Sequence, residues 1–305
     1  MNDQTSRRAV VRDPSGSESI EIINVPIPQP GAGQVRIEVA AAAINPVDLG
    51  VASGRFHQLG VVHQPVHTGL GWDFAGTVEA VGDGVTLTVG TLIAKFVDGF
   101  DRDYGSHADH VVVDAAHVAP LPDGMFLNVA AGVPLAVTTA GQLVKLIGAA
   151  PAAGRRLLVT GAAGAVGAHF AILAKEHGWE VTGLARAGDE EFVRGLGVEF
   201  VDETTQGWDV VVDAAAMQAE ALRLVRDGGR FVGVQPALRL PEERGITVDV
   251  VVSHPDVTLL SSLLERVAAG HLPARIHATL PLTEIVSAYQ LLAKGNVRGR
   301  IVVVP

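Results

Sequence analysis

Hydrophobic residues follow two different patterns along the chain. In the first part, short runs alternate apolar and polar residues, as at 35–39 and 76–82, and turns rich in glycine and proline separate these runs. Alternation with a period of two is typical of half-buried strands. We therefore expect a compact β-rich domain over residues 1–120.

From about Leu121 the pattern changes to short apolar runs that alternate with helical stretches rich in Ala, Leu and Val. Strands are expected at 157–160, 180–184, 210–212 and 230–234, and helices at 128–147, 165–177 and 256–269. Such alternation predicts a parallel sheet with helices on its faces. Residues 121–269 are thus expected to form an α/β domain, and 270–305 return to mixed strand and helix.

Composition and charge narrow the class of protein. The 305 residues suffice for two domains, and with 48% hydrophobic and 18% charged residues a large core can be buried. A formal net charge of -10 argues against general binding to nucleic acid or to anionic membranes. The absence of cysteine excludes disulfides and cysteine-ligated zinc. Because we find no signal peptide and no long apolar run, we expect a soluble cytoplasmic protein.

A glycine-rich turn lies between the strand expected at 157–160 and the helix expected at 165–177. Three glycines spaced three apart in this context are typical of dinucleotide binding. The first allows a tight turn, the second lets the backbone approach a pyrophosphate, and the third lets the helix pack on the sheet. The helix N-terminus also offers free N–H groups to phosphates. The alternative is a plain turn in an alanine-rich protein. The expected cofactor-binding residues of this turn are Gly161, Ala162, Gly164, Ala165, Val166 and Gly167.

The end of the next strand indicates which dinucleotide binds. An acidic side chain about 20 residues beyond the turn bonds the ribose 2′-hydroxyl of NAD. Here the strand is followed by Arg186, a cation that suits the 2′-phosphate of NADP. Because Asp189, Glu190 and Glu191 follow closely, Arg186 is alternatively a solvated surface charge. The sequence therefore favours NADP(H) as the cofactor.

Several short motifs occur in a fixed order along the chain. They are residues 43–48 (AINPVD), 71–78 (GWDFAGTV), 105–111 (GSHADHV), the glycine turn and 298–303 (RGRIVV). Together they resemble the medium-chain dehydrogenase/reductase superfamily, in its zinc-free quinone oxidoreductase branch, over nearly the whole chain. The resemblance implies an α/β fold with two parts: a GroES-like β-rich catalytic domain, built from both ends of the chain, and a Rossmann doubly wound parallel-sheet domain. It also implies a cofactor in the cleft between the domains and, as the expected assembly, a homodimer.

Three positions of this resemblance bear on metal chemistry. Zinc-dependent relatives hold the catalytic metal with a Cys, a His and a later Cys or Asp. The matching positions here are Asn45, Trp72 and the apolar neighbourhood of Leu135. Asn and Trp do not make a zinc site, so we expect chemistry without a metal.

The side chains that could take part in chemistry are few. Asn45 is a candidate for orienting nicotinamide or substrate, or else a satisfied loop residue before a proline. Asp48 is given no catalytic role. His107 is expected in a strand, either as a proton donor or as a packed histidine, while the histidines at 57, 63 and 67 are expected to line a pocket or the surface. The expected cofactor-binding set also includes Thr139, Ala214 and Arg300.

Without a metal to polarise a carbonyl, the cofactor must supply the reactivity while the protein orients it against the substrate. Such a site suits small, electron-poor acceptors. We expect an NADPH-dependent, zinc-independent reductase that transfers hydride to quinones or α,β-unsaturated carbonyls. Residues 50–53 lack the Tyr, Arg or Lys that such relatives often carry. Two alternatives therefore stay open: a non-catalytic NADPH-binding sensor or structural protein, and an enoyl reductase specific to one pathway.

Overall fold

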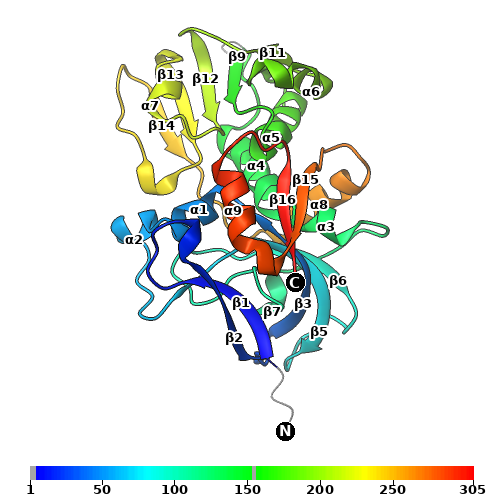
Figure 1. The fold of residues 1–305 in the computed structure, drawn as a ribbon. Coiled ribbons are helices and arrows are strands. Elements are labelled where there is room, and N and C mark those ends of the chain that lie inside the picture. The colour runs from blue at the N-terminus through cyan, green and yellow to red at the C-terminus, as the bar shows by residue number, and fades with distance from the viewer. Residues whose placement is uncertain (1–4, 153–155) are drawn as a thin grey trace. The chain divides into compact units, whose positions relative to one another are not determined.

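The computed structural model describes residues 5–152 and 156–305 (Figure 1). The chain divides into two compact units. The first combines the N-terminal part, up to Leu135, with Pro255–Pro305, and the second consists of Ala136–His254.

The first unit is rich in β-structure. A small sheet has the strand order β2-β1-β4, and a larger sheet has the order β15-β16-β3-β5-β6-β8, with β7 paired to β3. The strands are β1 (Thr5–Val11), β2 (Ile20–Pro26), β3 (Gln34–Ile44), β4 (Thr68–Gly69), β5 (Asp73–Val81), β6 (Leu92–Phe96), β7 (His110–Asp114), β8 (Ala119–Pro120), β15 (Ile276–Pro281) and β16 (Arg300–Val304).

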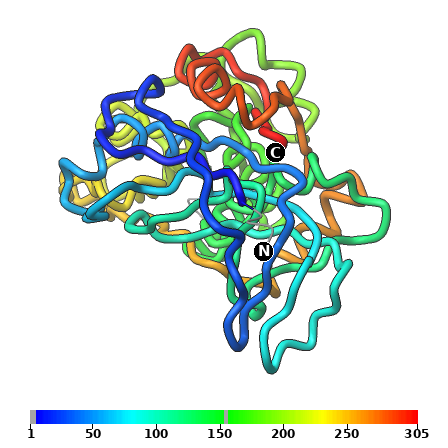
Figure 2. The backbone as a smooth tube through the Cα atoms, turned by 60° about the horizontal axis from the view of Figure 1, so that its bottom comes forward, coloured from blue at the N-terminus to red at the C-terminus, as the bar shows by residue number. Residues whose placement is uncertain are grey.

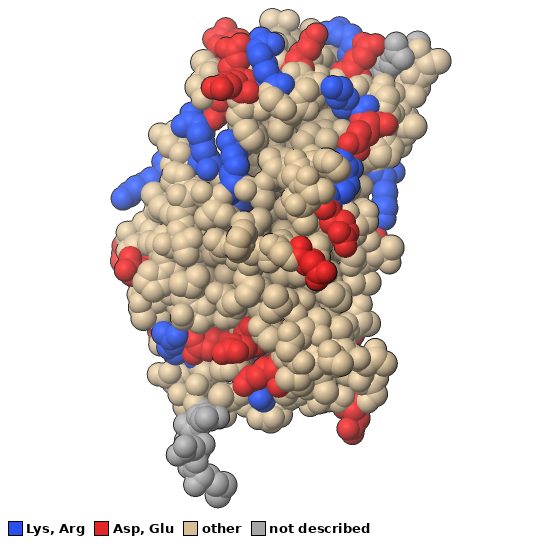
Figure 3. All heavy atoms as spheres, turned by 90° about the vertical axis from the view of Figure 1, so that its right-hand side faces the viewer, with Lys and Arg blue, Asp and Glu red and all other residues tan. Residues whose placement is uncertain are grey.

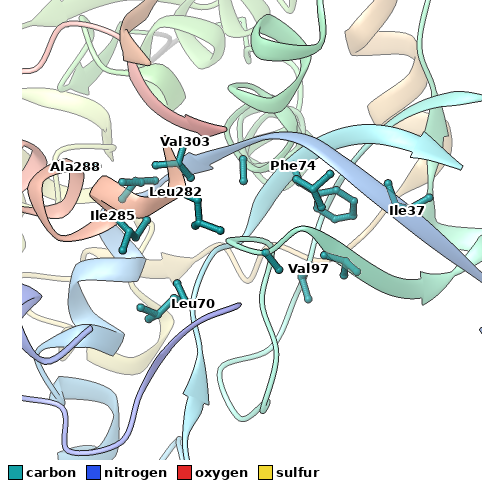
Figure 4. Close-up of a cluster of buried hydrophobic side chains, with 14 of the residues drawn as sticks. Ile37, Leu70, Phe74, Val97, Leu282, Ile285, Ala288 and Val303 are labelled. Carbon is teal, nitrogen blue, oxygen red and sulfur yellow. The ribbon is translucent and has the colours of Figure 1, made fainter. Parts of the chain in front are cut away.

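Both ends of the chain build this first unit. β16 pairs with β3, and the helix α9 (Ile285–Ala293) packs on both strands and beside the helix α1 (Pro46–Ala52). In Figure 2 the red C-terminal segment accordingly lies next to the blue N-terminal segment. The core mixes residues from both parts, including Ile37, Phe74 and Val97 from the first and Leu282, Ile285 and Val303 from the second (Figure 4).

Two helices lie next to the boundaries of the first unit along the chain, and both pack on its strands. α3 (Leu127–Ala131) packs on β3, β5 and β6, and α8 (Val257–Ala268) packs on β8. For this reason both helices belong to the first unit, although the composition of the sequence assigned them to the α/β domain. Composition reports the kind of local structure and not the sheet on which a helix packs.

The second unit is a six-stranded sheet in which all neighbouring strands are parallel. Its order is β11-β10-β9-β12-β13-β14. Numbered from the first strand of this unit, the order is 3-2-1-4-5-6, which is that of a Rossmann sheet. The strands are β9 (Arg156–Thr160), β10 (Glu180–Leu184), β11 (Glu199–Val201), β12 (Trp208–Asp213), β13 (Val225–Gly233) and β14 (Thr247–Val250).

Helices connect these strands, as parallel pairing requires. They include α5 (Ala165–Glu176), α6 (Glu190–Gly195) and α7 (Ala219–Leu222), while α4 (Pro134–Ile147) precedes β9. β9 and β10 lie within a residue of where the apolar runs predicted them. β11 and β14 were not predicted, because short strands at or near a sheet edge carry little apolar signal.

The surface carries charges of both signs. On the face shown in Figure 3, basic and acidic side chains lie next to one another. Ion pairs among the described residues include Arg226 with Asp209 at 2.6 Å and Arg230 with Asp249 at 2.7 Å. Among residues 5–152 and 156–305, none of the helices has both the length and the apolar composition needed to cross a membrane.

Candidate functional site

The glycine turn follows β9 and begins α5. Gly161 has a φ of 63°, a left-handed conformation that strains any residue with a side chain. A Cβ on Gly167 would overlap with the carbonyl oxygen of Gly161, so α5 approaches the turn too closely for alanine at this position. Both glycines are therefore required by the backbone itself, as the spacing of the motif predicted.

The start of α5 presents backbone N–H groups. Gly164 is its N-cap, and Ala168 N donates to Gly164 O at 2.9 Å. The N–H groups of Ala165, Val166 and Gly167 thus precede the first hydrogen bond of the helix, as is usual at a helix N-terminus. The turn also lies where the strand order reverses between β9 and β12, the place where ligands bind in such sheets. These features fit the pyrophosphate of a dinucleotide.

Two residues of the second unit that are predicted to contact the cofactor, Ala162 and Thr139, also contact other residues of the protein. The side chain of Ala162 is fully buried, and a Cβ on Gly183 of β10 would come within 2.6 Å of it. Ala162 therefore offers only its backbone to a ligand. Thr139 on α4 is nearly buried, and its hydroxyl lies 2.6 Å from that of Ser253.

The loop after β12 is organised by a carboxylate that no sequence pattern identified. Asp213 is buried and accepts hydrogen bonds from Thr160 Oγ1 at 2.6 Å and from the backbone N–H of Gln218 at 2.7 Å. This ties the loop to the end of β9, directly before the glycine turn. Ala216 and Gln218 have φ values of 57° and 58°, which are unusual for residues other than glycine. Ala214, a predicted cofactor contact, lies in this loop.

Arg186 lies just beyond β10, and its Nε pairs with Asp189 Oδ2 at 3.4 Å. The Arg186 side chain is 54% exposed, whereas that of Asp189 is 2% exposed. The ion pair fixes one edge of the guanidinium next to the protein. Contact with a 2′-phosphate stays a prediction.

In the first unit, strand register brings three polar residues together. Asn45 follows β3, Asp73 begins β5 and Arg300 begins β16. Ala43 is opposite Asp73, and Ile44 is opposite Ile301.

The three side chains form one buried network. Asn45 Nδ2 donates to Asp73 Oδ2 at 3.0 Å, and Arg300 Nη2 donates to Asn45 Oδ1 and, at 3.2 Å, to Asp73 Oδ2. The second oxygen of Asp73 accepts from Leu135 N at 2.7 Å. Both ends of the Asn45 amide are therefore held by protein groups, and Arg300 lies in an ion pair.

Asp48 is also fully buried, beside this network. Its carboxylate accepts from Asn45 N at 2.8 Å and from Gly71 N at 3.0 Å, which fixes the start of α1. Burial raises the pKa values of both Asp48 and Asp73 to about 6, against the lowering effect of nearby arginines and backbone donors. These contacts give Asp48 a structural role at the start of α1.

His107 is a packed, neutral histidine. It lies in the loop before β7 and not in a strand as expected, because the alternating pattern of this segment starts only at His110. Tyr289 OH lies 3.1 Å from its Nδ1, and its Nε2 lies 3.3 Å from Ala43 O. Because a carbonyl only accepts, Nε2 carries the proton and Nδ1 accepts from the tyrosine. Burial lowers the pKa of His107 to about 4.

The other histidines make separate contacts. His57 Nε2 lies 3.1 Å from Thr68 Oγ1, and His63 pairs with Asp101 at 3.4 Å on the surface. Across the described parts of the chain, no three His, Asp or Glu side chains are grouped to hold a metal ion. The residues at the matched metal positions do not fit zinc either. The Asn45 amide is bound by Asp73 and Arg300, and an indole is no zinc ligand.

The sequence matches two models of protein families. Residues 31–123 match the alcohol dehydrogenase GroES-like domain, and residues 187–303 match the zinc-binding dehydrogenase domain. The chain is 30% identical over 300 residues to the NADPH-dependent alkenal/one oxidoreductase of Arabidopsis thaliana, covering 92% of this chain and 75% of that protein. It is also 30% identical over 300 residues to the 2-methylene-furan-3-one reductase of Solanum lycopersicum, covering 92% of this chain and 74% of that protein.

A solved structure has the same fold. The quinone oxidoreductase from Coxiella burnetii superposes with a TM-score of 0.87 at 21% identity, covering 99% of this chain and 100% of that one. Through its similarity to the two plant reductases and the matched domain models, the chain belongs to the medium-chain dehydrogenase/reductase family of nicotinamide-dinucleotide-dependent oxidoreductases. The predicted fold class, a GroES-like domain with a Rossmann domain, is confirmed.

Proposed function

We propose that this protein reduces α,β-unsaturated carbonyl compounds with NADPH, and that quinones are its second class of acceptor. The observation that carries the proposal is the similarity to two reductases whose names specify alkenals and enones, or a methylene-furanone, over 92% of this chain. The glycine turn and Arg186 support the choice of NADPH, because they offer donors to a pyrophosphate and a cation to a 2′-phosphate.

Different residues of the chain would bind the cofactor and orient the reacting groups. When bound, a nicotinamide cofactor would supply the hydride and would itself be oxidised. The N–H groups at the start of α5 would hold its pyrophosphate, Arg186 would hold its 2′-phosphate, and Thr139 and Ala214 are further expected contacts. Arg300 and Asp73 fix the Asn45 amide in one orientation. His107 uses both ring nitrogens inside the protein, so we assign the proton to solvent.

The experiment uses the purified protein with NADPH or NADH and a panel of acceptors. The panel contains a small alkenal, a small enone, 1,4-benzoquinone and 1,2-naphthoquinone, and oxidation is followed at the nicotinamide absorbance. Product analysis by mass spectrometry identifies whether the C=C bond or the C=O bond is reduced. We expect NADPH oxidation with saturation of the C=C bond. Reactions without acceptor or without protein are the controls.

Two results would contradict the proposal. NADPH binding without turnover on any acceptor would favour the non-catalytic binding protein. An enoyl thioester is tested beside the panel, and turnover of that compound alone would favour an enoyl reductase of one pathway. A preference for NADH over NADPH would remove the role of Arg186 while leaving the reaction itself in place.

A further inference from the structure

Trp72 lies in the first unit between Gly71 and Asp73, next to the buried Asn45 network. Its side chain is nearly buried, with 6% of the residue exposed. The ring of Phe100 meets it edge-on with centroids 5.3 Å apart, and the guanidinium carbon of Arg102 lies 4.7 Å from its centroid. The indole is therefore held in place by an aromatic contact and a cation–π contact.

The indole N–H of Trp72 is buried and has no hydrogen-bond partner among the described residues. The other two tryptophans differ. Trp179 Nε1 donates to Gly148 O at 2.9 Å, and Trp208 Nε1 donates to Thr204 Oγ1 at 3.0 Å. A buried donor without an acceptor costs about 1–3 kcal/mol, so an acceptor that reaches the Trp72 N–H would be favoured.

Arg102 provides a second unused donor beside the indole. Its Nη2 donates to Gly71 O at 2.7 Å and its Nη1 donates to Gly99 O, which anchors the guanidinium over the ring. Its Nε is buried and has no partner within the described chain. An acceptor oxygen that gains negative charge would be favoured at this place, because an N–H dipole and a nearby cation both stabilise it.

We propose that the Trp72 Nε1–H donates a hydrogen bond to the carbonyl oxygen of the substrate, which makes Trp72 a catalytic residue of this oxidoreductase. The inference rests on the proposed function. Hydride adds to the β-carbon of the enone, the electrons of the C=C bond move to form the α-carbon–carbonyl double bond, and the oxygen becomes an enolate. NADPH is oxidised to NADP+, and solvent then protonates the α-carbon. The indole donor stabilises the enolate oxygen.

The kinetic test compares Trp72→Phe with the wild type on a small enone. Phenylalanine keeps an aromatic ring between Phe100 and Arg102 but removes the donor. We expect kcat to fall about 100- to 1000-fold, as is usual for loss of one donor to a developing oxyanion, with a smaller change in KM. Trp208→Phe is the matched control, because it removes an indole N–H that has its own partner in the second unit. Its kcat should stay within about twofold of the wild type. Equal kcat values for Trp72→Phe and the wild type would overturn the proposal.

A second measurement does not depend on turnover. Protein labelled with ¹⁵N at tryptophan gives a separate Nε1–H signal for each of the three tryptophans, and Trp72→Phe identifies the signal of Trp72. We titrate the wild type, saturated with NADP+, with 4-nitrophenolate, a planar anion whose oxygen resembles that of an enolate. The Trp72 signal should move downfield while those of Trp179 and Trp208 stay in place. An unmoved Trp72 signal in protein that binds the phenolate overturns the proposal, and so does an absence of phenolate binding.

The two measurements separate this inference from the proposed function. If the wild type reduces enones and Trp72→Phe does so equally well, only the role of Trp72 fails. If the wild type reduces no acceptor, the proposed function fails, and the titration still decides whether the indole N–H receives an oxygen ligand.

Discussion

At the scale of single residues, the proposed preference for NADP over NAD depends on Arg186. Replacing it with alanine removes the cation proposed for the 2′-phosphate. We expect the Kd for NADPH to rise about tenfold or more, since hydrogen bonds to charged groups contribute about 1.5–3 kcal/mol, while the Kd for NADH stays within about twofold. Fluorescence titration measures both values.

The control for Arg186 is Arg194→Ala. Arg194 lies on α6 and pairs with Glu190 at 2.8 Å, and its side chain is 56% exposed. It is a neighbouring surface arginine of the same unit with an ion pair of its own. Both dissociation constants should be unchanged in this variant. An equal loss of NADPH affinity in the two variants would mean that Arg186 acts only through the net charge of the region.

His107 makes the stability of the protein depend on pH. Its pKa is 6.5 in an unfolded chain and about 4 in the folded protein. The unfolded state therefore takes up a proton first, and the stability due to the neutral ring is present above pH 6.5 and lost as the pH falls through 4. Between pH 7 and 5 this loss amounts to about 2 kcal/mol.

Urea unfolding of the wild type and of His107→Gln at both pH values tests this expectation. The glutamine does not titrate, so the advantage of the wild type over the variant should shrink by about 2 kcal/mol on going from pH 7 to 5. Asp48 and Asp73 have raised pKa values and act in the opposite direction, but they are present in both proteins and cancel in the difference. An advantage that stays constant with pH would show that the ring is protonated equally in the folded and unfolded states.

At the scale of the elements, the close approach of α5 to the glycine turn can be tested with one methyl group. In Gly167→Ala the added Cβ overlaps with Gly161 O, which belongs to the backbone and cannot move aside alone. We expect a loss of about 1–3 kcal/mol in the free energy of unfolding, as is usual for overpacking, and at least tenfold weaker NADPH binding. Denaturant unfolding and fluorescence titration measure the two effects.

Gly195→Ala is the matched control at the end of α6. A Cβ there meets no atom within 4 Å, so the change should leave stability equal or slightly higher, because alanine favours helix. If Gly167→Ala behaves in the same way, α5 does not need the close approach, and the turn must bind its ligand in another manner.

How far the sequence predicted these elements depends on the range of the interactions that form them. β9, α5 and the glycine turn were predicted because each has a local signal: an apolar run, a helical period and spaced glycines. The contacts of Asp213 with the loop after β12 were not predicted, because an aspartate at the end of a strand can have many different roles. The partners of Asn45 were also missed, because they depend on strand register between residues 28 and 255 positions away in sequence.

At the scale of the whole molecule, the sequence predicted that the two ends of the chain share one domain, through its resemblance to a known family. The limits of the units were not predicted from composition. α3 and α8 are helices in sequence pattern, yet they pack on strands of the first unit. Which sheet a helix covers depends on the three-dimensional path of the chain, and no local pattern records it.

The ion pair of Asp73 with Arg300 joins these two ends of the chain, 227 residues apart in sequence. Arg300→Met leaves the fully buried Asp73 carboxylate without its cation, and breaking a buried pair in this way costs about 3–5 kcal/mol. In the double variant with Asp73→Asn, neither charge is left unpaired. We expect the double variant to lose at least about 2 kcal/mol less than the sum of the two single variants, because residues in direct contact couple. Urea unfolding without cofactor measures all four proteins. If the losses in the free energy of unfolding are additive, Arg300 stabilises the C-terminal strand β16 through packing alone. The charge of Asp73 is then compensated by the amide donors of Asn45 and Leu135.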